Sequence, residues 1–181
     1  MTNIDLWMLK TGKTEPKDLD DNPQVIYGTK AEEHIRELFE LDYPRFRVEY
    51  EPNNMWINNR MPWAHASLDL WMEDDRGRLG VGEIKTALIT NSRQKAAWEN
   101  RVPDHFYIQL IHNMAVCEAQ FGILIAQLRW ERDDDVFKIT RHYTVNADDV
   151  LEEMIMLMEA EEKFWNNVQK GIEPAQILPE I

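Results

Sequence analysis

The pattern of hydrophobic and polar positions is clearest in the middle of the chain, where it predicts a β-hairpin. Residues 66–72 alternate, so every second side chain lies on the same face of a strand. One face consists of Ala66, Leu68, Leu70 and Met72, and the opposite face of Ser67, Asp69 and Trp71. Residues 74–77 are typical of a tight turn, and residues 79–85 are small or apolar until the strand ends in charge. The second strand is therefore predicted to be buried and central.

The same periodicities predict the remaining elements. Thr29 and Glu32 have the spacing of a capping box, which predicts a helix from about 29 to about 41. Pro103 begins a helix to about 119, with a polar stripe that either faces solvent or lines a cleft. The polar stripe consists of His105, Gln109, His112 and Asn113. Strands are predicted over 45–51, 54–58, 121–128 and 136–144, with a loop over 58–62 and an acidic C-terminal helix over 147–170.

These elements predict an α/β fold with a central mixed β-sheet flanked by helices. The chain of 181 residues is expected to form a single domain over 1–181, with a short N-terminal lead over 1–27. A hydrophobic content of 44% with seven Trp excludes a disordered chain.

Composition also limits the location of the protein. No apolar run is long enough to span a membrane, and the N-terminus lacks the pattern of a signal peptide, so no membrane partner is expected. The single cysteine, Cys117, excludes an internal disulfide and is consistent with a reducing compartment. These features favour a cytoplasmic protein.

The net charge of −13 is unfavourable for a protein that contacts DNA, because phosphate contacts need Lys and Arg. The charge is, however, unevenly distributed. Residues 146–181 carry nine acidic and two basic side chains. By contrast, residues 84–102 carry Lys85, Arg93, Lys95 and Arg101 against Glu99 alone. The sequence therefore allows a local basic patch, formed by Arg93, Lys95 and Arg101, beside an acidic body.

The hairpin also carries the candidate chemistry. Glu83 and Lys85 share one face of the second strand, and pairing of the strands can bring Asp69 close to Glu83. Carboxylates are hard oxygen ligands suited to Mg²⁺ or Mn²⁺, and a lysine can orient a water and offset charge on a phosphate. This is the D-x(n)-E-x-K arrangement of metal-dependent phosphodiesterases. The competing interpretation is a solvated Glu–Lys ion pair at a strand end.

Glu32 also has two interpretations. It can close the N-terminal turn of its helix, or it can be a further acidic group directed at the metal site. Spacing alone does not distinguish them.

Five motifs along the chain support the metal-site interpretation. They are L-W-M-L-K-T-G at 6–12, Gly28 to Glu32 with E-L-F-E at 37–40, Ser67-Leu-Asp69 with Glu83-Ile-Lys85, Pro103 with Gln109 and His112, and E-K-F-W-N-N-V-Q-K-G at 162–171 with Pro174. In this order they resemble the YqaJ-like viral recombinase family, which includes the lambda-type alkaline exonucleases within the PD-(D/E)xK nuclease fold.

The resemblance implies a restriction-endonuclease-like core and a Mg²⁺- or Mn²⁺-dependent exonuclease. It would digest double-stranded DNA ends, 5′-to-3′, in phage-type recombination with a single-strand annealing protein. By the same resemblance the protein would form homo-oligomeric, ring-shaped trimers in the cytoplasm of a bacterial host, encoded by a phage or prophage.

The resemblance also implies roles for individual residues. Asp69, Glu83 and the carbonyl of Ile84 would bind the metal, and Lys85 would position the attacking water. Glu32 would assist through the metal or its waters, and Gln109 would orient water or phosphate. Ser67 would touch a phosphate, and the DNA backbone would be held by Arg93, Lys95 and Arg101.

Some family features differ in this chain. Family members usually carry, upstream of the first motif, an Arg and a Gly-Gly-Ser-type segment that help hold a 5′-phosphate, and this sequence begins too late to include them. Ile111 stands where a second Gln is frequent, and Phe106 where a Tyr is common. These differences keep a nicking or structure-specific endonuclease open as an alternative. The net charge keeps a second one open, a non-catalytic acidic DNA mimic or adaptor.

Overall fold

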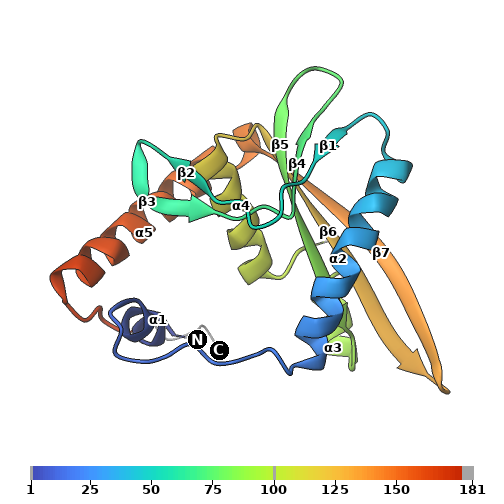
Figure 1. Ribbon diagram of the computed structural model, residues 1–181, viewed down its shortest axis with the longest axis horizontal. Coiled ribbons are helices and arrows are strands. Elements are labelled where there is room, and N and C mark those ends of the chain that lie inside the picture. The colour runs from blue at the N-terminus through green and yellow to red at the C-terminus, as the bar shows by residue number, and fades with distance from the viewer. Residues whose placement is uncertain (1, 100, 177–181) are drawn as a thin grey trace.

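The centre of the fold is a five-stranded mixed sheet (Figure 1). The computed structural model describes residues 2–99 and 101–176. The strand order in the sheet is β1 (Arg47–Glu49), β4 (Leu70–Glu73), β5 (Leu79–Leu88), β6 (Phe121–Arg132) and β7 (Asp135–Asn146). Strands β5 and β6 are parallel, and the other neighbours are antiparallel. A separate two-stranded sheet pairs β2 (Trp56–Asn58) with β3 (Met61–Ala66).

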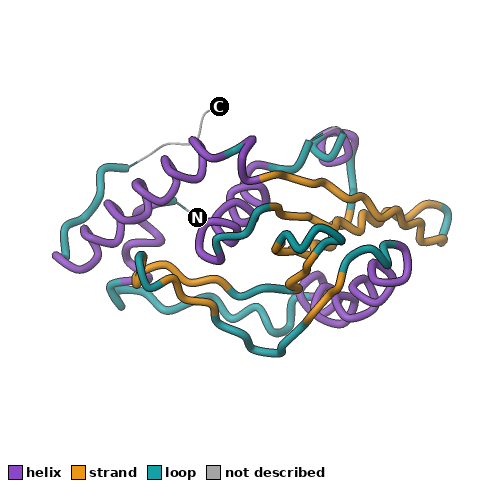
Figure 2. The backbone as a smooth tube through the Cα atoms, turned by 90° about the horizontal axis from the view of Figure 1, so that it is seen from above, coloured by secondary structure: helices purple, strands orange, loops and turns teal. Residues whose placement is uncertain are grey.

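Helices cover both faces of the large sheet (Figures 1 and 2). The helices are α1 (Asn3–Lys10), α2 (Pro23–Asp42), α3 (Ser92–Ala96), α4 (Asp104–Cys117) and α5 (Leu151–Lys170). Helix α2 packs on one face and α4 on the other, and α5 packs against α4. The prediction of a central mixed sheet flanked by helices is therefore confirmed.

The two faces bury separate hydrophobic cores. On one face, Ile35 and Phe39 of α2 pack against a group of sheet residues that includes Ile84. On the other, Leu110 and Met114 of α4 pack against a group that includes Val81, Leu124 and Ala126. Because side chains alternate along a strand, β5 presents Ile84 to the α2 side and its neighbour Glu83 to the α4 side. Glu83 is thereby placed inside a core rather than at a surface.

Two glycines of β5 allow the neighbouring strands to approach closely. A Cβ atom added at Gly82 would lie 2.3 Å from a Leu70 side-chain carbon, and one added at Gly80 would lie 2.3 Å from the Phe121 ring. The hairpin turn itself uses Gly77, whose φ is 73°. This close packing fixes β4 firmly against the strand that carries Glu83.

The prediction of a helix beginning near residue 29 was wrong. Helix α2 begins at Pro23, and the side chain of Asn22 accepts a hydrogen bond from the Gln24 N–H at 2.9 Å. Asn before Pro is a strong start signal, because Asn caps the first turn and Pro needs no hydrogen-bond partner there. Thr29 lies within the helix and donates to the Val25 carbonyl instead of capping. Glu32 therefore has no capping role.

The predicted first strand of the hairpin is two separate pieces. The chain leaves β3 at Ala66 and enters β4 only at Leu70, so the alternation over 66–72 is broken. Ala66 and Leu68 pack in the core beneath α4, whereas Leu70 and Met72 pack in the core beneath α2. The predicted loop over 58–62 is wrong in part as well, because β3 begins within it at Met61.

The predicted acidic helix over 147–170 is present with a different start. A 3₁₀ turn spans Ala147–Asp149, and α5 follows from Leu151. Helix α1 lies beside the segment that follows α5, where the Asn3 side chain donates to the Ala175 carbonyl at 2.7 Å. Within the described residues, no helix combines the length and apolar character needed to cross a membrane.

Candidate active site

The hairpin register places Asp69 beside Glu83. Leu70 pairs with Gly82 across the antiparallel strands, so the preceding Asp69 lies opposite Glu83. The Asp69 Oδ2 atom accepts a hydrogen bond from the Ile84 N–H at 2.7 Å, which anchors the carboxyl group to β5. The two carboxyl groups are close enough that the charge of Asp69 raises the pKa of Glu83. Two carboxyl groups are thus held together at the start of β4.

Glu83 is surrounded by hydrogen-bond donors although it is only 2% exposed. Its Oε1 atom accepts from Lys85 Nζ at 2.5 Å and from Gln109 Nε2 at 2.7 Å. Its Oε2 atom accepts from Asn113 Nδ2 at 2.9 Å. A buried carboxylate is normally compensated by such donors, and here they fix both oxygens in position.

The two carboxyl groups hold their protons more tightly than free ones do. Burial raises the pKa of Glu83 to about 7, the charge of Asp69 adds to this effect, and Lys85 opposes it. Burial also raises the pKa of Asp69, against the effects of the Ile84 N–H and of Lys85. The site therefore concentrates negative charge that its own donors only partly offset.

Glu32 reaches this cluster from helix α2. Its pKa is raised by burial and then by the charge of Asp69, while Arg36 and Lys85 lower it. Glu32 is half-buried, and Arg36, one turn further along α2, is 8% exposed. With its capping role excluded, Glu32 is left as an acidic group facing the hairpin.

The structure brings most of the predicted site residues together. Glu32, Asp69, Glu83, Lys85 and Gln109 form one cluster, connected by the contacts above. In this cluster Ile84 contributes its backbone N–H, and its side chain is buried beneath α2.

The predicted phosphate and DNA contacts lie outside the cluster. Ser67 is exposed in the connection between β3 and β4, two residues before Asp69. Arg93 and Lys95 are exposed on α3, and Arg101 is exposed between α3 and α4. These basic residues follow β5, the strand that carries Lys85.

Two residues of the cluster were not assigned a role from the sequence. Asn113 belongs to the polar stripe of α4 and lies one turn beyond Gln109, so both amides face Glu83. Arg36 lies one turn beyond Glu32 on α2. This four-residue spacing is the sequence signal that could have placed Arg36 beside Glu32. The stripe therefore lines the site instead of facing solvent at these positions.

The side chains of the cluster suit Mg²⁺, an ion that needs only a few protein ligands. No group of three or more His, Cys, Asp or Glu side chains in the described ranges is arranged to hold a metal. Mg²⁺ is commonly bound by one or two carboxylates, with waters and substrate phosphates completing its shell. Asp69 and Glu83 would provide two carboxylates, and the charge of Asp69 raises the pKa of Glu83, as expected for a site that would bind a cation.

The fold of this chain is similar to that of a solved nuclease. It matches the crystal structure of an alkaline exonuclease (LHK-Exo) from Laribacter hongkongensis with a TM-score of 0.60 and 18% sequence identity, over 94% of this chain and 79% of that one. A structure of LHK-Exo in complex with dAMP matches with a TM-score of 0.59 and 18% identity, over 94% and 80% of the two chains. The predicted PD-(D/E)xK-type core is thereby confirmed as the fold.

Sequence comparison identifies the family. No protein with a curated description matches the chain. The family model for the YqaJ-like viral recombinase domain, however, matches residues 1–120, a range that includes every member of the cluster from Glu32 to Asn113. The predicted resemblance is therefore confirmed, and the chain belongs to the YqaJ-like viral recombinase domain family.

Proposed function

We propose that this protein is a metal-dependent deoxyribonuclease that removes nucleotides from the ends of double-stranded DNA. The observation that carries the proposal is the position of Asp69 opposite Glu83 in the hairpin register, beside Lys85, at the start of β4. Membership of a viral recombinase family supports DNA as the substrate. The similar fold of an alkaline exonuclease supports hydrolysis, and the dAMP bound to that protein is a single nucleotide, the size an exonuclease releases.

The metal site would consist of Asp69, Glu83 and the backbone carbonyl of Ile84. When Mg²⁺ or Mn²⁺ is bound, it supplies Lewis-acid polarisation of the scissile phosphate. The Ile84 N–H holds the Asp69 carboxyl group in place, so the same residue would act through both of its backbone groups. Neither carboxylate needs to move far, because both are already fixed by hydrogen bonds.

Lys85 would orient the attacking water and stabilise the negative charge that develops on the phosphate. Its ammonium group is held next to Glu83, and its side chain is mostly shielded from solvent, which strengthens its electrostatic effect. Gln109 shares the same Glu83 oxygen and would orient water or phosphate beside it. Glu32 would assist from α2 through water, since it is electrostatically coupled to Asp69.

The DNA would be held by groups around this cluster. Ser67 is exposed close to Asp69 along the chain and would donate to a phosphate oxygen. Arg93, Lys95 and Arg101 would hold the backbone by charge. In the described part of the chain, no carboxylate lies within salt-bridge distance of these three side chains.

Family membership supports the biological setting of the proposal. The enzyme would digest DNA 5′-to-3′ in phage-type recombination, in the cytoplasm of a bacterial host, and would supply single strands to an annealing protein. It would act as a homo-oligomer, as a trimer by analogy with lambda-type members, and 1–181 would form a single nuclease domain.

The products of digestion test this proposal. The protein is incubated with linear double-stranded DNA, with and without a 5′-phosphate, and with closed circular DNA, each in Mg²⁺, in Mn²⁺ and in EDTA. We expect mononucleotides from linear DNA in either metal and none in EDTA. Cutting of closed circles would show that the protein is an endonuclease on the same core and not an exonuclease. Absence of cleavage of any DNA would contradict the nuclease proposal and support a non-catalytic adaptor.

A further inference from the structure

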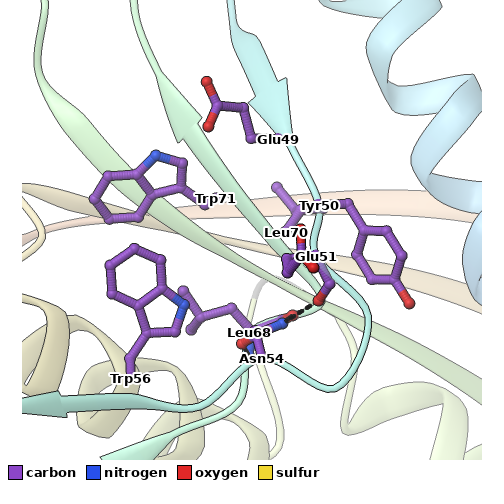
Figure 3. A pocket seen from close by; sticks show the side chains of 8 residues that line it. All are labelled: Glu49, Tyr50, Glu51, Asn54, Trp56, Leu68, Leu70 and Trp71. Carbon is purple, nitrogen blue, oxygen red and sulfur yellow. Dashed lines mark hydrogen bonds between the residues drawn. The ribbon is translucent and has the colours of Figure 1, made fainter.

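A small aromatic pocket lies next to the candidate active site and has no role in the hydrolysis proposed above. The indole rings of Trp56 and Trp71 stack with their centroids 4.8 Å apart and their planes 17° apart (Figure 3). Leu68, Leu70 and Tyr50 complete the apolar wall of a cavity of about 180 Å³. This volume is below the ~300–1,000 Å³ of most small-molecule sites, so the cavity suits a single ring system.

The pocket is built before any ligand arrives. The Asn54 side chain donates to the Leu68 carbonyl and accepts from the Leu68 N–H, both at 2.8 Å. Leu68 lies in the connection between β3 and β4, so these bonds tie that connection to the segment that leads into Trp56. Trp71 packs into the core beneath α4, so the inner ring of the stack is rigid.

The outer ring remains open to solvent. Trp56 is 39% exposed, and its neighbours Met55 and Ile57 are 59% and 63% exposed. Tryptophan normally buries a large apolar area, so an exposed indole fixed against a second one is an available stacking surface. Successive bases of single-stranded DNA bind to such surfaces in many proteins.

The pocket and the acidic cluster share one short segment of chain. Leu68 and Leu70 line the pocket and flank Asp69, while Trp71 lies two residues beyond Asp69, about 7 Å along an extended chain. This is the length of about two base steps of ~3.4 Å each. Arg36 provides a second connection, because it stacks on Tyr50 at 3.7 Å and acts electrostatically on Asp69.

The charge of the pocket favours a base over a phosphate. Glu49 and Glu51 line it, and although the Glu49 carboxylate lies 3.5 Å from Arg47 Nε, the two carboxylates would oppose binding of a phosphate group. Carboxylates do accept hydrogen bonds from the exocyclic amino groups of bases, as Glu and Asp do from cytosine N4. The stacked ring and the two acceptors together suit the flat face and amino edge of a nucleobase.

We propose that Trp56 and its pocket bind a nucleobase of single-stranded DNA next to the phosphodiester held at Asp69 and Glu83. The proposal rests on the proposed function, because it assigns part of the DNA path into that site. The strand that enters would be separated from its complement, with one base stacked on the outer face of Trp56.

Binding of single-stranded DNA to a hydrolysis-deficient protein tests the stacking directly. Trp56→Ala, Trp56→Phe and Ile57→Ala are each combined with Lys85→Ala, and affinity for a labelled oligonucleotide is measured by fluorescence anisotropy. We expect Trp56→Ala to weaken binding about 5- to 150-fold, the range for loss of one base–aromatic stack. Trp56→Phe should retain most of the affinity. Ile57→Ala, a change on the same exposed strand, should retain all of it.

An abasic scan separates stacking from a merely structural role. A single abasic residue is moved along the oligonucleotide, and Lys85→Ala alone should lose affinity sharply at one position. The Lys85→Ala, Trp56→Ala protein should show no such position. Equal affinity of the two proteins, or an equal loss on removal of any base, would overturn the inference. Cleavage of DNA by the wild-type chain is measured separately. Digestion without stacking refutes only the base-stacking inference, and stacking without digestion refutes only the proposed nuclease activity.

Discussion

At the scale of single residues, the site depends on a buried Glu83 that meets both a like charge and three donors. The donors Lys85, Gln109 and Asn113 occupy both of its oxygens, and Asp69 lies against it. Without a metal ion, Lys85 only partly offsets the repulsion between the two carboxylates, which destabilises the folded protein. The arrangement is explained if the residues are placed for catalysis at a cost in stability.

Asp69→Asn should therefore stabilise the metal-free protein and abolish its activity. The new amide can accept from the Ile84 N–H and donate to Glu83, so it fits the same place without the repulsion. We expect a gain of about 1 kcal/mol, which raises Tm by about 2–4 °C for a protein of this size. Thermal unfolding in EDTA and in Mg²⁺ measures both the gain and the loss of any metal-induced rise in Tm.

The exposed Asp148→Asn is the matched control, because it makes the same chemical change outside the site. It should leave Tm and the metal response unchanged. A lower Tm for Asp69→Asn in EDTA would contradict the view that the two carboxyl groups repel each other in the metal-free fold.

Asn113→Ala should slow DNA hydrolysis by about 10- to 100-fold, the usual effect of removing a residue that orients a metal ligand. The change leaves Glu83 Oε2 without its donor while the residues proposed to contact substrate stay in place. The rate of mononucleotide release and the Mg²⁺ concentration for half-maximal rate are measured. An unchanged rate with an unchanged metal requirement would show that Asn113 does not position Glu83.

The sequence predicted the residues of this cluster better than their contacts. Strand alternation and the hairpin placed Asp69 near Glu83, and family motifs selected Glu32 and Gln109. The contact of Asn113 with Glu83 depends on how α4 lies across the sheet, a long-range arrangement that spacing along one helix does not specify.

At the scale of elements, α4 is held between β3 and α5 by His112. Its Nδ1 atom lies 3.0 Å from both Glu161 carboxylate oxygens, and its Nε2 atom lies 3.0 Å from the His65 carbonyl. Both ring nitrogens face acceptors, so only the protonated imidazolium can donate to both. The docking of α5 on α4 therefore includes a pH-sensitive contact.

This contact should weaken as the pH rises above 6.5. Burial lowers the pKa of His112, but the hydrogen bonds to Glu161 and to the His65 carbonyl outweigh it, so the net pKa is raised above the ordinary value of 6.5. The contribution is complete below pH 6.5 and is lost as the pH rises through the higher folded-state pKa. Wild-type Tm should therefore fall across this range by more than that of Glu161→Gln, as measured by thermal unfolding at a series of pH values. An equal fall in Tm with pH for the two proteins would contradict a contribution of the His112–Glu161 contact to stability.

Element positions were predictable where local signals agreed and not where they competed. The β-hairpin turn, the buried β6 and the helix after Pro103 follow directly from turn residues and periodicity. Helix α2 was predicted to begin too late because Thr29 and Glu32 imitate a capping box, whereas Asn22 and Pro23 provide the actual start. The break between β3 and β4 was missed because Leu68 continues the alternation although it packs in the opposite core from Leu70.

At the scale of the whole molecule, an acidic protein must approach an acidic substrate. The net charge is −13, but Arg93, Lys95 and Arg101 are exposed and follow the strand that carries Lys85. Replacing all three by Ser should weaken duplex DNA binding and reduce the slope of log affinity against log salt by about 0.9 for each phosphate contact removed. Titrations at several salt concentrations measure this slope, and Lys138, Lys163 and Lys170, also exposed, provide the charge-matched control. A slope equal to that of wild type would exclude the basic patch from the DNA path.

The most direct test of the whole account is the rate at which the protein degrades linear double-stranded DNA in Mg²⁺, compared with that of Lys85→Ala. Lys163→Ala, which removes an exposed lysine of α5, serves as the control for charge. The account predicts metal-dependent release of mononucleotides by wild type and Lys163→Ala, with a loss of at least about 100-fold in Lys85→Ala, as for removal of a group that stabilises the transition state. Equal rates for all three proteins, or no degradation by any of them, would contradict the assignment of Asp69, Glu83 and Lys85 as a hydrolytic site.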